Sequence, residues 1–433
     1  MADLIEARVL KGFRDFLPEA EIERRLLGEI LESVFRSFGF VPIDTPALEY
    51  AEILLGKGGG ETEKQVYRFQ DHGGRDVALR FDLTVPFARF MAEHRNELAL
   101  PFKRYHMAKV WRGENTQRGR YREFTQCDFD IVGSESAAAD FEILLLMRES
   151  LRSIGAGEVS IRMNHRGVFN RFLAHLGVAD KSVETLRTVD KLAKIGKEET
   201  LSLLSGLTGR ERGEKILSFI QPKGSWDETL AAMAEAAGGE GPDTERLAVL
   251  RRFMVDAKVA DVFVLDPSIT RGLDYYTGVV YETFLDAMPS IGSVCSGGRY
   301  DNLASLYSKE KLPGVGSSIG LDRLIAALES LGKSKRSAGF ARVAIACVDE
   351  ALGGRYQALA TRFRAAGLPC EVFSEKRKLP QQFASAEKKG LAWVVVADGP
   401  ALDADSLTLR ELATRTDRTG LSAAEIIGTV KAG

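Results

Sequence analysis

Cysteine, histidine and long apolar runs are all scarce in this sequence. The four cysteines lie far apart and include no CxxC pair, so we expect reduced, buried thiols rather than disulfides or a zinc site. The five histidines share no i, i+4 spacing, which argues against a metal held by dedicated protein ligands. No stretch approaches the ~20 apolar residues of a membrane span, and acids occupy the N-terminus where a signal peptide would be apolar. We therefore expect a cytoplasmic protein with no membrane partner.

An excess of charge of either sign is also lacking. The sequence has 59 basic and 61 acidic residues, for a net charge of -2. This balance argues against a general nucleic-acid coating protein but permits a local basic surface. With 45% hydrophobic and 28% charged residues, the composition is that of an ordinary soluble globular protein. The 433 residues exceed one ordinary domain, so roughly three units are expected.

Composition divides the chain into an α+β body, a helical insertion and an α/β tail. Stretches rich in Lys, Glu, Leu and Ala predict helices in the insertion, whereas strand-like runs precede and follow it. In the tail, strands alternate with helices, which predicts right-handed crossovers. The predicted boundaries are 1–178 and 261–332 for the two parts of the body, 179–260 for the insertion, 333–340 for a linker and 341–433 for the tail.

Local patterns predict several elements of the body. Apolar positions at helical spacing predict a helix over about 19–38, and the strand that follows over 40–46 contains two prolines, which favour an edge position. Strand-like runs from 262 to 320, including 271–278, predict an antiparallel meander.

A second hairpin is predicted nearer the N-terminus. Residues 67–70 and 77–86 have strand-like composition, and a helix is expected over about 87–93. In this interpretation the second strand ends with Asp82 and Thr84, which provide an acceptor for an ammonium group.

The stretch 109–133 is the most informative part of the sequence. Two strand-like runs flank the polar turn 115–119, which predicts an antiparallel hairpin. Side chains alternate across a strand. One face of the second run would carry Arg122, Phe124, Gln126, Asp128 and Asp130, and the other Tyr121, Thr125, Cys127, Phe129 and Ile131.

The charged face admits two interpretations, a solvated outer surface or a binding floor. Burial of several charged groups on one strand face is unfavourable unless each is paired or meets a polar ligand. Arg112 and Glu114 are expected on the partner strand, with the ring of Phe124 between them. A cation, a flat ring and an acid together suit a nucleoside phosphate, which favours the binding floor.

Two further segments are candidates for ligand contacts. Arg323 is expected in the first turn of a helix after a glycine-rich strand, where a cation opposes the helix dipole and a bound anion would remove the conflict. The run 271–278 places two tyrosines between Arg271, an aspartate and two glycines, which suits a small polar ligand held by tyrosine hydroxyls.

Taken in order, these motifs resemble the histidyl-tRNA synthetase family of class II aminoacyl-tRNA synthetases over nearly the full length. The resemblance covers the family's motif 1 at 40–46 with the helix before it, motif 2 at 112–131, motif 3 at 314–324, and the two histidine signatures at 271–278 and 296–301. The wording of 82–89 and 121–130 is closer to archaeal and eukaryotic members than to the common bacterial type.

The resemblance implies a role for each site residue. Histidine would be bound by Asp82, Thr84 and Gln126 at its α-amino group and by Asp130 and Tyr276 at its imidazole, and Tyr275 would be a further histidine-binding residue. ATP would be bound by Arg112 at the α-phosphate, Phe124 at adenine, Glu114 near the exocyclic amine, and Arg120 and Arg323 at the distal phosphates. Arg271, catalytic together with Arg112, would lie against the α-phosphate and the substrate carboxylate and neutralise developing charge.

The resemblance also implies an α+β catalytic body, an α/β anticodon-binding domain and a homodimer formed through motif 1. The expected activity is activation of L-histidine with ATP and Mg²⁺, followed by transfer to tRNA(His). Two alternatives stay open: a non-catalytic paralogue that regulates ATP phosphoribosyltransferase, and an RNA-binding or signalling protein with a synthetase-like body. The paralogue generally lacks the tail and has altered motif 2 and histidine signatures, which are intact here.

Overall fold

The computed structural model describes residues 4–56, 63–270, 275–307, 309–334 and 338–432. Contacts divide the chain into two units, residues 1–14 with 27–334 and residues 15–26 with 335–433. Among the described residues, no helix is both long and apolar enough to cross a bilayer. All four cysteines are buried, as predicted, and they form no disulfide within the described part of the chain.

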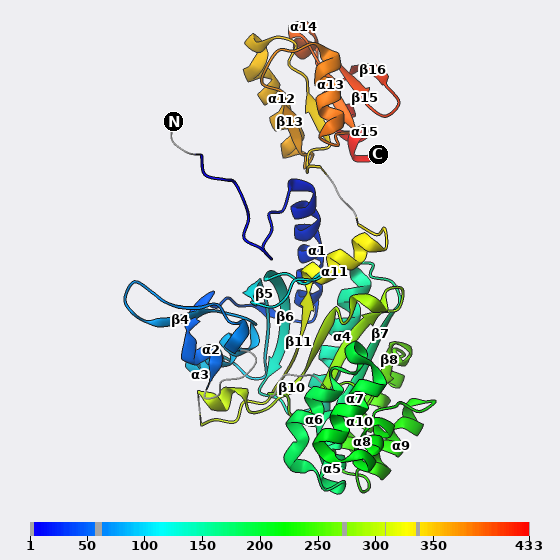
Figure 1. Ribbon diagram of the computed structural model, residues 1–433. Coiled ribbons are helices and arrows are strands. Elements are labelled where there is room, and N and C mark those ends of the chain that lie inside the picture. Colours follow the sequence, from blue (N-terminus) through cyan, green and yellow to red (C-terminus); the bar gives the residue numbers. More distant parts are fainter. Residues whose placement is uncertain (1–3, 57–62, 271–274, 308, 335–337, 433) are drawn as a thin grey trace. The chain divides into compact units, whose positions relative to one another are not determined.

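The first unit is built on a sheet of eight strands in the order β1-β5-β6-β11-β10-β9-β7-β8 (Figure 1). The strands are β1 (Val41–Pro42), β5 (Phe102–Trp111), β6 (Glu123–Val132), β7 (Val159–His165), β8 (Phe263–Leu265), β9 (Val279–Leu285), β10 (Cys295–Tyr300) and β11 (Gly314–Gly320). Pairing is antiparallel except for β1 with β5 and β7 with β8. The proline-containing β1 lies at the sheet edge, as its sequence predicts.

The prediction of an antiparallel meander is right for β9, β10 and β11 and wrong for β8. Ile161 of β7 pairs with Phe263 of β8 in a parallel register. The helices between β7 and β8 form a long crossover connection. Such a connection allows the second strand to run beside the first in the same direction. Residues 275–278 are not a strand either, and 271–274 lie outside the described residues.

The predicted hairpin within 109–133 forms the ribbon β5–β6, whose strands are second and third in the sheet, next to the edge strand β1. Its register runs from Phe102 opposite Val132 to Trp111 opposite Glu123, so the loop between the strands is longer than the predicted turn 115–119. Glu114 therefore lies in the loop and not on the partner strand. The ribbon ends there because Gly113 N donates to Gln65 O at 2.7 Å, outside the ribbon.

Four helices pack against one face of the sheet and form a hydrophobic core with it. These helices are α1 (Pro18–Ser37), α4 (Ala137–Ser153), α5 (Arg166–His175) and α11 (Leu321–Ser330). Phe129 and Ile131 of β6 are buried in this core with Phe35 and Ile143. The alternation predicted for β6 is thus confirmed, with apolar side chains on one face and polar side chains on the other.

The segment expected to be helical forms α6 (Ser182–Val189), α7 (Leu192–Thr208), α8 (Arg210–Phe219), α9 (Trp226–Ala236) and α10 (Pro242–Asp256), green in Figure 1. Leu204, Ile216, Trp226 and Leu250 belong to the same hydrophobic cluster as the residues under the sheet. The helices therefore share a continuous core with the body.

A small sheet, β2 (Leu48–Tyr50), β4 (Asp76–Leu79) and β3 (Arg68–Gln70), is accompanied by α2 (Ala51–Leu55) and α3 (Thr84–Glu93). The predicted hairpin is present, but its second strand ends at Leu79 and α3 begins at Thr84, so the strand predicted over 77–86 is wrong. Asp82 Oδ1 accepts from Val85 N at 3.1 Å and stabilises the first turn. Pro86 is tolerated in that turn because its missing N–H would have no helical partner there.

The second unit contains the α/β tail, with five strands in the order β13-β12-β14-β15-β16. They are β12 (Val343–Ile345), β13 (Cys370–Val372), β14 (Trp393–Val396), β15 (Leu407–Glu411) and β16 (Thr416–Leu421), with helices α12 (Gly353–Ala365), α13 (Leu379–Lys388), α14 (Gly399–Asp403) and α15 (Ala423–Ala432). The predicted alternation of strands and helices is confirmed. β16 was not predicted because it is polar and exposed, without the alternation that marks a half-buried strand.

Candidate functional site

A row of paired residues crosses five strands and forms the floor of the candidate site. Arg104 of β5 pairs with Asp130 of β6, Asp130 with Gly316 of β11, Gly316 with Gly298 of β10, and Gly298 with Val280 of β9. Paired residues project from the same face of a sheet, so the two glycines leave a depression beside the Asp130 carboxylate. A Cβ atom at Gly316 would lie 1.9 Å from Asp130 Oδ1, so no larger residue fits there without displacing that carboxylate.

The Asp130 carboxylate is buried and has a neighbour on each side. Tyr300 Oη donates to Oδ1 at 2.5 Å, and Arg104 Nη2 lies 2.7 Å from Oδ2. Arg104 is itself fully buried, with its Cζ 4.1 Å from the centroid of the Phe87 ring. Burial raises the pKa of Asp130, while Arg104 and Tyr300 oppose that rise. The floor thus presents a fixed carboxyl group beside a permanent cation.

Asp128 precedes Asp130 by two residues on β6, so it lies on the same face of the sheet, and it pairs with His106 of β5. It is 2% exposed, and its Oδ1 has no hydrogen-bond partner within the described chain. Burial raises the pKa of Asp128 to about 7; Arg104 opposes the rise, and repulsion from Asp130 and Asp82 adds to it. Burial also lowers the pKa of His106 to about 4, so its imidazole is neutral at pH 7. Three buried carboxyl groups therefore lie within electrostatic reach of one another.

Asp82 and Gln126 each leave a buried oxygen available to a ligand. Oδ1 of Asp82 accepts from Val85 N in the first turn of α3, whereas Oδ2 has no hydrogen-bond partner among the residues described. Gln126 Nε2 donates to Ser318 Oγ at 2.8 Å, and its Oε1 is likewise unpartnered in the described structure. Thr84 follows Asp82 as the first residue of α3 and is half-buried. Two unmatched buried acceptors suit an ammonium group, which brings several donors.

Tyr275 and Tyr276 lie on the other side of the depression. Their ring centroids are 4.6 Å apart, and the ring of Tyr275 meets Tyr300 edge-on at 6.3 Å. Tyr276 is buried directly over Gly298, because a Cβ atom there would lie 2.8 Å from Tyr276 Cδ1. Asp130 and Tyr276 therefore border the same pair of glycines from opposite ends.

A second group of polar residues gathers where β5 ends. Arg112 Nε donates to Phe81 O at 2.8 Å, and its Cζ lies 5.2 Å from the centroid of the Phe124 ring. In the loop beyond, Glu114 and Arg120 are 3.9 Å apart. Phe124 is half-buried, so one part of its ring is accessible.

Arg323 of α11 joins this group from a distant part of the sequence. A Cβ atom at Gly119, whose φ is +70°, would lie 3.3 Å from Arg323 Cα, so the loop packs closely on the start of the helix. Burial lowers the pKa of Arg323 to about 10, with repulsion from Arg120 and Arg112 adding to the effect and Glu114 opposing it. Three guanidinium groups with one carboxylate form a site that favours an anion.

The conflict predicted between Arg323 and the helix dipole is relieved within the protein. Asp322, in the same first turn, is buried, accepts from Thr125 N at 2.6 Å and pairs with Arg14. A carboxylate at this end of a helix is favourable. Arg323 itself extends away from the helix and donates to Ser293 O at 2.6 Å.

A shallow hollow adjoins the loop between β5 and β6. Six of its lining residues come from the loop and the short helix before β3, and the seventh, Lys194, comes from α7 of the helical segment. They are Gln65, Gly113, Glu114, Asn115, Gln117, Arg120 and Lys194. The helical segment thus places one lysine beside the loop that carries the predicted ATP contacts.

Eleven of the twelve predicted site residues lie in the described structure, and Arg271 lies outside it. These eleven form two neighbouring groups: one around the Asp130–Tyr276 depression, the other around Arg112 and Arg323. The groups adjoin, because Asp82 lies within electrostatic reach of Arg112.

Sequence reasoning missed four residues of the floor: Arg104, Asp128, Tyr300 and Gly316. Tyr300 and Gly316 fall inside motifs that were recognised, and Asp128 was assigned to the charged face but given no role. Arg104 and His106 alternate on β5 toward the same face, a pattern that could have been found by extending the ribbon backward from Lys109.

Asp128→Asn should alter the pH dependence of stability. Because the folded-state pKa of Asp128 is raised above its ordinary value of 3.8, the folded protein binds the extra proton between about pH 4 and 7. The contribution of this group to stability is therefore lost as pH rises through that range. We expect the variant to have a higher Tm than the parent at pH 8 and a similar Tm at pH 5. Thermal denaturation across pH 5–8 measures the effect, and parallel curves for the two proteins would contradict it.

Together, the mostly antiparallel sheet, its charged floor bordered by arginines and the separate α/β tail define a class II aminoacyl-tRNA synthetase. The chain matches the family model for histidyl-tRNA synthetase over residues 12–324 and that for an anticodon-binding domain over residues 342–433. It belongs to the histidyl-tRNA synthetase family.

Similar proteins cover almost the whole chain. A histidine–tRNA ligase of Treponema denticola is 53% identical over 98% of this chain and 98% of its own length. One from Rhodopirellula baltica is 48% identical over 95% of each chain. The crystal structure of histidyl-tRNA synthetase from Nostoc sp. PCC 7120 superposes with a TM-score of 0.85 at 32% identity and covers 99% of this chain and 100% of its own. These similarities do not favour the regulatory paralogue.

Proposed function

We propose that this protein is a histidine–tRNA ligase that activates L-histidine with ATP and transfers it to the 3′ end of tRNA(His). The observation that carries the proposal is the contiguous floor, on which unmatched buried acceptors adjoin a cluster of three arginines. Such a floor can bind an ammonium-bearing amino acid and a polyphosphate side by side. Attack of the histidine carboxylate on the α-phosphorus then requires alignment of the two groups and neutralisation of their mutual repulsion.

Histidine would lie over the glycine depression. Its α-ammonium group would donate to Asp82, Gln126 and Thr84, and its imidazole would lie between Asp130 and Tyr276. This arrangement would select histidine because an analogue without both ring nitrogens leaves a buried polar group unpaired, which costs about 10⁴- to 10⁵-fold in specificity. Asp130, already engaged by Arg104 and Tyr300, would serve as a rigid acceptor.

ATP would lie at the end of β5. Adenine would stack on Phe124 with its exocyclic amine near Glu114, and Arg112 would contact the α-phosphate. Arg120 and Arg323 would contact the distal phosphates. Mg²⁺ would enter with the nucleotide, bound by phosphate oxygens, and supply further charge neutralisation. Arg271, by family resemblance, would complete the cation set around the reacting centre.

The tail would bind the anticodon of tRNA(His), and the protein would act in the cytoplasm. A homodimer formed through the motif 1 region is supported by apolar side chains exposed on three of its elements. Ile30 of α1, Val41 of β1, and Leu48 and Tyr50 of β2 are 38%, 46%, 41% and 51% exposed. We propose the domain boundaries predicted from composition.

Histidine-dependent exchange between ATP and pyrophosphate tests the activity directly. The purified chain should catalyse exchange with histidine and no other standard amino acid, and should charge tRNA(His). A folded protein that binds tRNA but lacks exchange would instead support the non-catalytic alternatives.

Asp130→Ala should raise the KM for histidine by about 10- to 100-fold, because a charged hydrogen-bond partner is removed. The KM for ATP should change by less than about twofold, since Asp130 faces the depression and not the arginine cluster. Tyr300→Phe leaves Asp130 with Arg104 alone and should give a smaller rise of the same kind. Equal changes in both KM values would count against an imidazole contact.

A further inference from the structure

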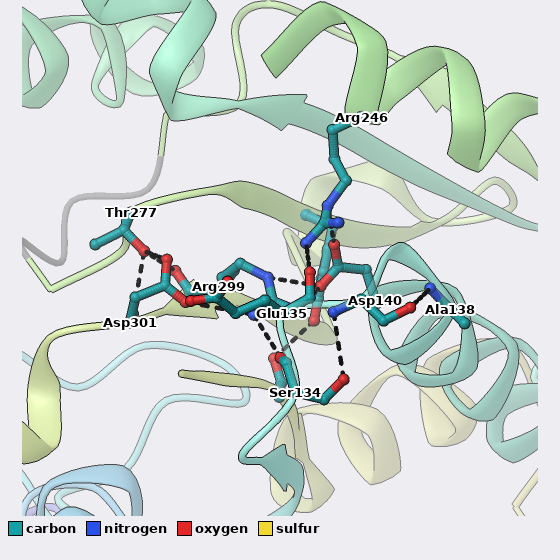
Figure 2. Close-up of polar contacts among 11 residues, drawn as sticks. Ser134, Glu135, Ala138, Asp140, Arg246, Thr277, Arg299 and Asp301 are labelled. Atoms are coloured by element: carbon teal, nitrogen blue, oxygen red, sulfur yellow. Dashed lines mark hydrogen bonds and ion pairs between the residues drawn. The ribbon is translucent and has the colours of Figure 1, made fainter. Parts of the chain in front are cut away.

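A buried ionic network joins the helical segment to the loop that carries Tyr275 and Tyr276. Its members come from five separate parts of the chain, and Figure 2 shows them converging on Asp140 and Arg299. They are Ser134 and Glu135 after β6, Asp140 in the first turn of α4, Arg246 of α10, Arg299 and Asp301 at the end of β10, and Thr277.

Asp140 is the centre of the network. Its carboxylate is fully buried, with Arg299 Nε 2.9 Å from Oδ1 and Arg246 Nε 2.8 Å from Oδ2. Burial raises the pKa of Asp140, and both guanidinium groups oppose the rise. The same arginines also bind the strand-to-helix connection, because Arg299 Nη1 donates to Ser134 O at 2.9 Å and Arg246 Nη2 to Glu135 O at 2.5 Å.

From Arg299 the network continues to Thr277. Arg299 Nη1 donates to Asp301 Oδ1 at 3.3 Å, and Thr277 Oγ1 donates to Asp301 Oδ2 at 2.7 Å. Thr277 also receives a bond from Asp301 N at 3.1 Å, and its own N donates to Arg299 O at 2.8 Å. A Cβ atom at Gly278 would lie 3.0 Å from Arg299 Cδ, so the backbone packs directly on that arginine. Thr277 is therefore held by three hydrogen bonds, two with Asp301 and one with Arg299, immediately after the tyrosine pair.

Buried ion pairs are a costly way to stabilise a fold, because desolvation offsets most of their attraction and apolar residues often serve as well. Their advantage is a fixed geometry. Here the fixed element is Thr277, which follows the two tyrosines bordering the glycine depression.

We propose that Arg246, Asp140, Arg299 and Asp301 are positioning residues that hold Thr277, and through it Tyr275 and Tyr276, in the geometry that binds histidine. This inference rests on the proposed function. It makes affinity for histidine depend on α10 of the helical segment, although Arg246 belongs to none of the family's catalytic motifs.

The test uses variants of the full chain in the exchange assay without tRNA. Thr277→Val keeps the side-chain shape but removes the hydroxyl, whereas Thr277→Ser keeps the hydroxyl. We expect Thr277→Val to raise the histidine KM about tenfold, because small displacements of a binding group have large effects. The ATP KM should stay within about twofold, and Thr277→Ser should restore near-parental values, a rescue that a purely structural role of the methyl group would not give.

A second pair of variants tests the contribution of Arg246, the member of the network that lies on α10. Arg246→Met should raise the histidine KM about fivefold, within the range of coupling through a contiguous network. Arg252→Met, which alters an exposed arginine of the same helix, should change neither KM. The double variant Arg246→Met/Thr277→Val should be no worse than Thr277→Val by more than about twofold, because both changes break one chain of contacts.

Unchanged histidine KM values in Thr277→Val and Arg246→Met, or equal rises in the KM for histidine and ATP, overturn the proposal. Circular dichroism and Tm, measured on the same preparations, identify any variant that fails to fold. Arg246→Met remains informative if Thr277→Val is unstable, because it leaves the Asp140–Arg299 pair in place. A parent protein without histidine-dependent exchange defeats the proposed function instead, so the two failures are distinguishable.

Discussion

Arg112→Met should lower the rate of histidine-dependent ATP–pyrophosphate exchange by about 10³-fold, the upper range for removal of one group that stabilises transition-state charge. The guanidinium is prepared for this role in the free protein. Its Nε donates to Phe81 O at 2.8 Å, and its Cζ lies 5.2 Å from the centroid of the Phe124 ring. These two contacts fix the position of the guanidinium group. Methionine retains much of the aliphatic volume but removes the charge.

The stability of this variant should change little, because Arg112 is only half-buried and forms no ion pair with the other described residues. Arg112→Lys keeps the charge without the planar two-point geometry and should lose less activity, about 10- to 100-fold. Arg118→Met, at the exposed tip of the same loop, serves as a control and should leave tRNA-free exchange unaffected. If Arg112→Met retained more than a tenth of the parental kcat/KM with an unchanged Tm, the assigned role would be wrong.

Gly316→Ala should disrupt both the site and the sheet. The added methyl carbon would lie 1.9 Å from Asp130 Oδ1 and 2.8 Å from Phe129 O. The backbone cannot withdraw, because β11 is paired with β6 on one side and β10 on the other. Overpacking of this kind costs about 1–3 kcal/mol, and the displaced carboxylate should raise the histidine KM by at least about tenfold.

Gly320→Ala provides the matched control for stability. It lies on the same strand, but its added Cβ would meet no heavy atom closer than 3.8 Å. Its free energy of unfolding should therefore change by less than about 0.5 kcal/mol. Denaturant unfolding of the two variants measures the difference, and equal stability losses would show that the contact with Asp130 is not the cause.

The sequence was most predictive where a local period determines which side chains are buried. The alternation along 123–132 placed Asp130 on the polar face and Phe129 in the core, and both assignments are confirmed. The tail was predicted for the same reason, since its strands and helices have distinct periods. The proximity of Arg112 and Arg323 was predicted from the family resemblance, because no local pattern in the sequence indicates it.

The misses have a common physical cause. Pairing partners far apart in the chain leave no local signal, as with Arg104 beside Asp130, or Arg246 beside Asp140. The end of β4 was misplaced because composition alone does not reveal that the side chain of Asp82 accepts from Val85 N in the first turn of the next helix. The predicted direction of β8 was wrong because it depends on the path of the chain through the six α-helices, α5 to α10, that separate β8 from β7.

The floor places positions 104, 130, 316, 298 and 280 side by side, so its assembly during translation depends on strands that are far apart in the chain. During translation, β6 emerges with one long edge unpaired. Its partner on that edge is β11, and the paired residues Asp130 and Gly316 are 186 positions apart in the sequence. The edge therefore stays unpaired until β11 has been synthesised. Unpaired edges and slow non-local pairing favour aggregation. The nascent chain is therefore expected to require chaperone protection until β11 has left the ribosome, and any product terminated before that strand should be both inactive and insoluble.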